Sequence, residues 1–241
     1  MSFPNFSVPR TVIPYLCSKV QQATGGFPVR RAYAVGQNYA AHAKEMGAVA
    51  RDSAAEPFYF GKPADTIFFP EDGIVPFPGK TTNFQYEGEL VLAIGLGGSD
   101  IKPEDAYKHI IGYAVGIDLT RRDLQQQFKN TGRPWDFAKS FDYSGPVSPI
   151  VFLDPAPQSN SDLISDAKIS TTVNGEVKQS SNINDMITSI PNLVAYLSQY
   201  VALQPGDVIF TGTPEGVGKI VPGDVITVAV EGVAELKVTL K

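Results

Sequence analysis

The chain has 241 residues, of which 43% are hydrophobic and only 19% charged, with 22 Gly and 19 Pro. This composition excludes intrinsic disorder and coiled coils and favours short elements joined by tight turns. The net charge of −5 gives no basic surface for nucleic acid or an anionic membrane. One cysteine and two histidines exclude a disulfide framework and a metal site rich in Cys or His. Since no apolar run is long enough to span a membrane and no leader pattern is present, we expect a soluble, cytoplasmic protein.

The first 30 residues show no clear periodicity, so we expect Met1–Gly26 to be irregular and residues 1–30 to precede one domain at 31–241. The apolar pattern then predicts a strand at Arg31–Val35 and a helix at Asn38–Met46 that ends at Gly47. Short apolar segments follow at Phe58–Phe60 and Thr66–Phe69, separated by Gly and Pro. Beyond them the pattern predicts a strand buried on both faces at Leu90–Ile94, a helix opening at Pro103–Lys108, a strand at Ile110–Ile117 and a helix at Arg121–Lys129 before Gly132. The small, polar segment Ala48–Pro57 is predicted to be a mobile loop.

The second half of the chain is dominated by β-strand patterns. It predicts a hairpin at Lys168–Lys178 around a type I′ turn at Asn174-Gly175, a helix at Pro191–Gln199, and strands at Val208–Thr211, Val225–Val230 and Val233–Leu240. The sequence Pro-Gly-Asp-Val-Ile occurs at 205–209 and again at 222–226, which indicates two corners that lead into strands. Because strands outnumber helices and do not alternate with them, we predict an α+β, mainly β roll or barrel with a few short helices.

Two common catalytic motifs fail on inspection. The segment Thr211–Lys219 is similar to a phosphate-binding loop. However, Thr213 occupies the position of the required first glycine, and Ile220 occupies the position that requires Ser or Thr. No G-x-S-x-G elbow is present. Nucleotide binding and serine hydrolysis are therefore disfavoured.

Three carboxylates form a candidate metal site. Glu87 and Glu89 precede or begin the apolar strand ending at Ile94, and residues two apart on a strand point to the same face. Their charges would repel each other beside a buried strand unless a cation neutralised them. Asp118 ends the strand Ile110–Ile117 and is a natural third ligand, and three oxygen donors suit Mg²⁺ or Mn²⁺. The alternative is that Glu87 and Glu89 are solvated residues at the start of a strand, and spacing alone leaves both open.

His42 and Glu45 form a candidate acid–base pair. They lie three residues apart on the predicted helix, close enough for the carboxylate to orient the imidazole as a general base for a water molecule. The alternative is an ordinary pair on the helix surface. His109, beside Lys108 at the entry to a strand, is interpreted as structural.

Several segments resemble the motifs of the fumarylacetoacetate hydrolase family, in the family's order and over about Arg31 to Leu240. They are Val35–Met46 (V-G-Q-N-Y-A-A-H-A-K-E-M), Phe60–Pro63 (F-G-K-P), Tyr86–Leu90 (Y-E-G-E-L), Gly116–Asp123 (G-I-D-L-T-R-R-D), Ala138–Asp142 (A-K-S-F-D) and Thr211–Gly218 (T-G-T-P-E-G-V-G). The lead-in Phe27–Arg31 is similar to that of bacterial members that cleave fumarylpyruvate in the breakdown of gentisate, an aromatic acid. One residue departs from the pattern, since Gln37 replaces the usual arginine.

The resemblance implies a mixed β-roll, a homodimer, and a small-molecule 2-oxo acid as substrate. It implies roles for nine residues: Glu87, Glu89 and Asp118 as ligands of Mg²⁺ or Mn²⁺, His42, Glu45 and Lys139 in catalysis, and Arg122, Gln125 and Thr213 in substrate binding.

The same resemblance implies metal-dependent hydrolysis of a carbon–carbon bond in an acylpyruvate, with fumarylpyruvate giving fumarate and pyruvate. A second cation would have to bind the distal carboxylate, and the candidates are Arg122, Arg121 and Arg51. The alternatives on the same scaffold are oxaloacetate decarboxylation or tautomerisation and dienoate isomerisation. An alternative of another class is a non-catalytic, metal-dependent binder of small acids.

Overall fold

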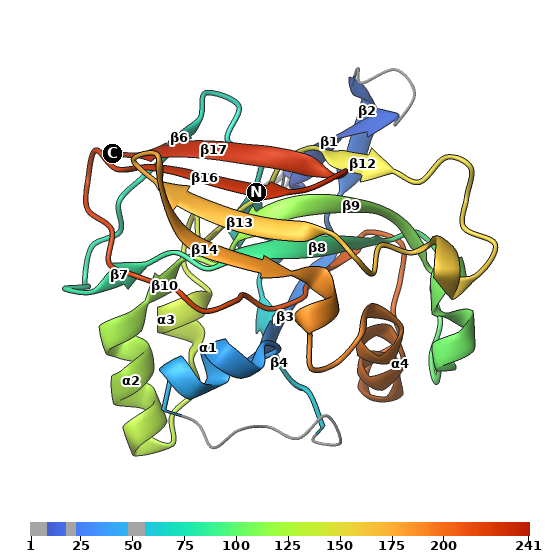
Figure 1. Cartoon of the computed structure of the whole chain (residues 1–241), viewed down its shortest axis with the longest axis horizontal. Coiled ribbons are helices and arrows are strands. Elements are labelled where there is room, and N and C mark those ends of the chain that lie inside the picture. Colours follow the sequence, from blue (N-terminus) through green and yellow to red (C-terminus); the bar gives the residue numbers. More distant parts are fainter. Residues whose placement is uncertain (1–8, 18–22, 48–55) are drawn as a thin grey trace, which may run out of the picture.

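The computed structural model describes residues 9–17, 23–47 and 56–241, and its strands form two main sheets (Figure 1). An eight-stranded mixed sheet has the order β2-β1-β12-β9-β8-β15-β3-β4, and a five-stranded sheet has the order β14-β13-β16-β17-β6. Two small sheets pair β10 with β7 and β11 with β5. The strands are β1 (Val12–Cys17), β2 (Ala23–Pro28), β3 (Arg31–Gly36), β4 (Phe58–Lys62), β5 (Ile67–Phe68), β6 (Ile74–Val75), β7 (Phe84–Gln85), β8 (Gly88–Ile94), β9 (Ile110–Ile117), β10 (Thr120–Arg121), β11 (Gly145–Pro146), β12 (Ile150–Phe152), β13 (Lys168–Val173), β14 (Glu176–Asn182), β15 (Asp207–Phe210), β16 (Val225–Val230) and β17 (Ala234–Leu240).

The α-helices α1 (Ala40–Glu45), α2 (Arg122–Thr131), α3 (Asp136–Lys139) and α4 (Ile190–Tyr200) are short and lie in the lower part of Figure 1, away from β17 and β6. The 3₁₀ helices are η1 (Ala64–Thr66), η2 (Pro103–Lys108), η3 (Asn160–Asp162) and η4 (Ile183–Asp185). The predicted mainly β fold with a few short helices is confirmed. Within the described ranges, no helix is long and apolar enough to cross a membrane.

Strand β8 is buried on both faces, as predicted, because its side chains enter two different cores. Leu90, Leu92 and Ile94 belong to the larger hydrophobic core, which includes residues of both main sheets. Val91 and Ala93 belong to a second core, which also includes residues of β1 and β3. Successive side chains of a strand point to opposite faces, so odd-numbered residues at the start of β8 face the side of the second core.

The turns agree with the sequence interpretation. Asn174 (φ 54°) and Gly175 (φ 82°) are both left-handed, as a type I′ turn requires, and they join β13 to β14. Gly206 and Gly223 also have positive φ and precede β15 and β16, so the repeated Pro-Gly-Asp sequence does form two corners. Helix α2 ends at Gly132, which has φ 64°.

The expectation of an irregular segment before residue 26 is wrong for its described part. Strand β1 pairs in parallel with β12 and antiparallel with β2, and β2 is the edge strand of the large sheet. The pattern was missed because β2 contains two glycines and ends in proline, residues that edge strands tolerate. Of the predicted loop at 48–57, residues 48–55 lie outside the described residues.

Candidate active site

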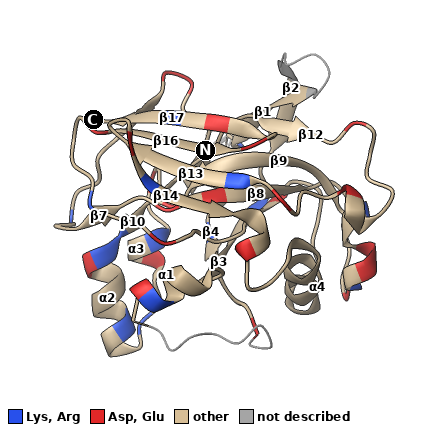
Figure 2. Cartoon of the chain, viewed as in Figure 1, with Lys and Arg blue, Asp and Glu red and all other residues tan. Residues whose placement is uncertain are grey.

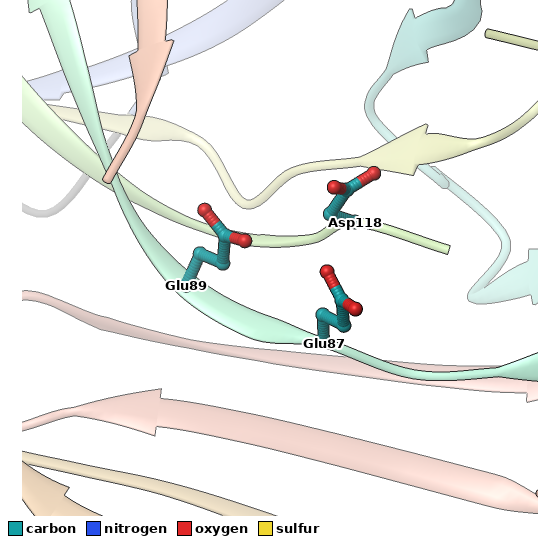
Figure 3. Close-up of side chains that lie close together, drawn as sticks. All are labelled: Glu87, Glu89 and Asp118. Atoms are coloured by element: carbon teal, nitrogen blue, oxygen red, sulfur yellow. The ribbon is translucent and has the colours of Figure 1, made fainter. Parts of the chain in front are cut away.

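Glu87, Glu89 and Asp118 meet where β8 begins and β9 ends (Figure 3). The two strands are antiparallel neighbours, with Gly88 opposite Ile117, and the Asp118 N–H donates to the Glu87 carbonyl at 2.8 Å. One carboxylate oxygen from each residue lies within 4.8 Å of the others, and each residue is at most 5% exposed. The structure therefore brings together the three carboxylates that the sequence singled out.

Three cations surround this carboxylate cluster. Lys139 Nζ, on α3, donates to Glu87 Oε2 at 2.6 Å and to Asp118 Oδ2 at 2.7 Å. Lys62 Nζ, at the end of β4, donates to Asp118 Oδ1 at 2.9 Å and also to the Lys139 carbonyl. Arg122, the first residue of α2, pairs with Glu87 through Nη2. Glu87 and Asp118 thus each contact two cations.

Glu89 has a different electrostatic environment from Glu87. Burial raises the pKa of Glu87, but Lys139 and Arg122 beside it lower that pKa more, to well below its usual range. Burial, together with the charges of Asp118 and Glu87, raises the pKa of Glu89 well above its usual value. Its contact is the Gly212 N–H, which donates to Glu89 Oε2 at 2.7 Å.

The donor set fits a hard divalent cation. Among the described residues, this cluster offers carboxylate oxygens as ligands, without imidazole or thiolate. A divalent cation between the three groups would favour the ionised form of Glu89, whose charge is least compensated by the protein. Mg²⁺ and Mn²⁺ both meet this requirement.

Gly212 is placed beside Glu89 by a close approach of two backbones. Its φ is +97°, and a Cβ at this position would lie 2.7 Å from the Cβ of Asn38. Asn38 is held by its own side chain, which donates to the carbonyls of Thr211 (2.9 Å) and Thr188 (3.1 Å) and accepts from the Thr188 N–H (2.8 Å). A glycine is therefore required for this N–H to reach Glu89.

His42 and Glu45 form the predicted pair. His42 Nδ1 lies 3.2 Å from Glu45 Oε2, and Glu45 also accepts from the Gly216 N–H at 3.1 Å. His42 is buried and lines the same cavity as Glu87 and Glu89. Helix α1 begins at Ala40 and not at Asn38, because Asn38 is engaged in the contacts described above.

Thr213 is in the cavity wall, but its hydroxyl is already engaged. The hydroxyl donates to the Gly88 carbonyl at 2.9 Å and accepts from Gln179 Nε2 at 2.8 Å. Gln179, which the sequence interpretation missed, reaches from β14 and also binds the Gly88 N–H and the Pro214 carbonyl. It connects the five-stranded sheet to the site, and no local pattern in β14 marks it.

Arg122 and Gln125 are adjacent on α2. Arg122 Nη1 donates to Gln125 Oε1 at 2.5 Å and Nε donates to Gln85 Oε1 at 2.7 Å, so the guanidinium is fixed on three sides. Seven of the nine predicted site residues, all except Asp118 and Glu45, line one cavity. They are His42, Glu87, Glu89, Arg122, Gln125, Lys139 and Thr213. Asp118 contacts the lysines at this cluster, and Glu45 contacts His42.

Two other arginines were candidates for a distal cation. Arg121 lies over the ring of Phe141 and donates to the Phe137 carbonyl, and it is not among the residues that line the cavity. Arg51 lies outside the described residues. Lys62 was not predicted as a site residue, although a lysine between Gly61 and Pro63 at the end of an apolar strand was the available signal.

Comparison with known proteins agrees with this geometry. The family model "Fumarylacetoacetate (FAA) hydrolase C-terminal" matches residues 31–241. The fumarylpyruvate hydrolase of a Ralstonia species is 43% identical over 196 residues, which cover 81% of this chain and 98% of the relative. The oxaloacetate tautomerase YcgM of Escherichia coli is 39% identical over 212 residues, covering 88% of this chain and 93% of the relative.

The structural comparison includes a relative that carries a metal. The crystal structure of fumarylpyruvate hydrolase from Pseudomonas aeruginosa, in complex with Mn²⁺ and pyruvate, superposes with a TM-score of 0.87 at 41% identity, covering 98% of this chain and 99% of that one. Sequence, fold and the acidic cluster agree with one another. The chain belongs to the fumarylacetoacetate hydrolase family.

Proposed function

We propose that this protein is a metal-dependent hydrolase that cleaves a carbon–carbon bond of an acylpyruvate, converting fumarylpyruvate and water to fumarate and pyruvate. The observation that carries the proposal is that Glu87 and Glu89, two members of the buried carboxylate cluster, line one cavity together with the His42 imidazole. The Ralstonia and P. aeruginosa relatives, both named as fumarylpyruvate hydrolases, support this substrate.

Binding of the pyruvate part falls to the cluster and α2. Mn²⁺ or Mg²⁺ held by Glu87, Glu89 and Asp118 would supply positive charge for the carboxylate and 2-oxo oxygens of the substrate. Arg122 and Gln125 line the cavity beside these ligands and provide N–H donors that orient the acid. Because Arg122 is already fixed by Glu87 and Gln85, it is preorganised for this contact.

His42 is the proposed general base. Glu45 accepts a hydrogen bond from Nδ1–H, which leaves Nε2 free to take a proton from water. The water oxygen adds to the C4 carbonyl carbon, and the C3–C4 bond then breaks. Its electron pair goes to the pyruvate part, which gains a proton at C3, while C4 becomes the carboxyl carbon of fumarate. Lys139 has one N–H beyond those given to Glu87 and Asp118, and this donor is available to the oxygen that becomes negative.

The test combines metal removal with substitution of the proposed base. Chelation should abolish cleavage of fumarylpyruvate, and Mn²⁺ or Mg²⁺ should restore it. His42→Ala and Glu45→Ala should each lower kcat by about 10²-fold or more, the scale for loss of a general base, whereas Lys44→Ala on the exposed part of α1 should not. Full activity after complete metal removal, or wild-type rates in both base variants, would refute the proposal.

Oxaloacetate tautomerisation is the second candidate, because the E. coli relative with that name is 39% identical over most of its length. It requires no attacking water, so the Glu45→Ala variant should lose acylpyruvate cleavage more than tautomerisation. A homodimer and a role in the breakdown of aromatic compounds are further proposals that rest on the family resemblance, and a cytoplasmic location is one that rests on the composition of the chain. Light scattering on the purified protein tests the first of these.

A further inference from the structure

We propose that Lys129 binds the distal carboxylate of the substrate and thereby gives the enzyme its preference for acylpyruvates that end in a second acid group. The inference rests on the proposed function and goes beyond it, since it assigns a specificity-determining residue to the end of the substrate that the metal does not reach.

The first observation is a continuous polar face of α2. Arg122, Gln125, Gln126 and Lys129 follow the i, i+3, i+4, i+7 spacing that places residues on one side of a helix, and all four line the cavity. The face begins at the carboxylate cluster, where Arg122 contacts Glu87. It ends two helical turns away at Lys129.

The second observation is the charge state of this face. Of the cations that line the cavity in the described part of the chain, Arg122 and Lys139 are both bound to carboxylates. Lys129 has no carboxylate within salt-bridge distance among the described residues, and its side chain is exposed. Within residues 9–17, 23–47 and 56–241, it is therefore the cavity cation whose charge is available to an anionic ligand. Figure 2 shows basic residues at both ends of α2.

The third observation is one of length. Seven residues of α-helix span about 10 Å, and helical side chains lean towards the N-terminus, so Lys129 points back towards the cluster. The two carboxyl carbons of extended fumarylpyruvate are separated by six C–C bonds, or roughly 7–8 Å with bonds of about 1.5 Å. A substrate whose pyruvate part lies at the cluster would thus place its second carboxylate within reach of the lysine ammonium.

The cavity between these two ends suits a flat, unsaturated chain. Phe60 and Trp135 line it, with ring centroids 6.0 Å apart and planes inclined at 62°. Gln37, which has φ +57° and stands where the family motif has arginine, lines it as well. Because a neutral amide occupies that position, the distal charge falls to Lys129.

The experiment uses two substrates that differ only at the distal end, fumarylpyruvate and crotonylpyruvate, in which a methyl group replaces the distal carboxylate. The ratio of their kcat/KM values is measured for the wild type, Lys129→Met, Lys129→Arg and the control Lys237→Met, which removes an exposed lysine of β17 outside the cavity. We expect Lys129→Met to lower the ratio by about fivefold or more, the scale of one charge-assisted contact near solvent. Lys129→Arg should keep most of the preference, and Lys237→Met should keep all of it.

Ionic strength gives an independent readout. Added salt should lower the wild-type preference for fumarylpyruvate, because the pair of Lys129 and the distal carboxylate lies near solvent. The preference of the Lys129→Met variant should change much less. An unchanged ratio in Lys129→Met, with both substrates still cleaved, would refute the role of Lys129 and leave the proposed function intact. If the wild type cleaved neither substrate, the proposed function would fail, and this inference with it.

Discussion

Gly212 and Gly223 have nearly the same backbone conformation but very different surroundings. Their φ angles are +97° and +94°. An added Cβ at Gly223 meets no heavy atom within 4 Å, whereas at Gly212 it would lie 2.7 Å from the Asn38 Cβ. An alanine at either position incurs the strain of positive φ, about 1–2 kcal/mol. The difference in stability between the two variants therefore measures the energetic cost of the close contact between residue 212 and Asn38.

The cost at Gly212 is larger because Asn38 cannot move away easily. Three hydrogen bonds fix its side chain, and forcing extra volume against a well-packed group costs about 1–3 kcal/mol. We expect Gly212→Ala to lower the free energy of unfolding by about 2–5 kcal/mol and Gly223→Ala by about 1–2 kcal/mol. For a chain of this size, each kcal/mol corresponds to a Tm decrease of about 2–4 °C.

Urea denaturation of both variants, first in chelator and then with Mn²⁺, provides the measurement. Gly212→Ala should also lose part of the stabilisation that Mn²⁺ gives the wild type, because the Gly212 N–H holds Glu89. Gly223→Ala should retain that stabilisation in full. Equal losses of stability in the two variants would refute the close approach, and equal stabilisation by Mn²⁺ would refute the role of the N–H.

Three further substitutions test other parts of the site. Gln179→Leu leaves two buried backbone groups without a partner and should lower the free energy of unfolding by about 2–5 kcal/mol, measured by urea denaturation. Lys62→Met leaves Asp118 with one cation fewer and should lower the free energy of unfolding by about 3 kcal/mol or more. The control Lys237→Met should lower it by about 0.5 kcal/mol or less. The pKa of Glu89 is higher in the folded state than its value of 4.5 in the unfolded state. The metal-free wild type should therefore lose stability as the pH rises from 4.5 through the folded-state pKa of Glu89. Glu89→Gln should lack this loss, and a parallel pH profile would show that Glu89 is not the group responsible.

Much of the fold was predictable because its patterns are local. The strands Ile110–Ile117 and Val225–Val230 coincide with the predicted ranges, since each is a run of apolar or alternating residues bounded by turns. The alternation along a strand also predicted that Glu87 and Glu89 share a face. The position of Asp118 at the end of the strand Ile110–Ile117 indicated it as the third ligand, and the resemblance supported this choice. The close contact of His42 with Glu45 followed from helical spacing.

The remaining features depend on contacts between distant segments. Gln179 lies 91 residues from Gly88, whose N–H it binds, and a glutamine in a polar strand looks like any other. Lys62 and Lys139 meet at Asp118 because β4 and α3 pack together, which no spacing in the sequence shows. Lys129 was missed for a different reason, since a lysine near the end of a helix is ordinarily interpreted as a surface residue.

The number of residues between the carboxylates and the buried part of strand β8 determines the face of the sheet to which Glu87 and Glu89 point. Glu87 and Glu89 share the parity of Val91 and Ala93, while Leu90, Leu92 and Ile94 fill the other core. Inserting one residue between Glu89 and Leu90, or deleting Leu90, would turn both carboxylates towards the opposite face or exchange the contents of the two cores. We therefore expect this segment to tolerate substitutions but not insertions or deletions, which the connections between strands can accommodate.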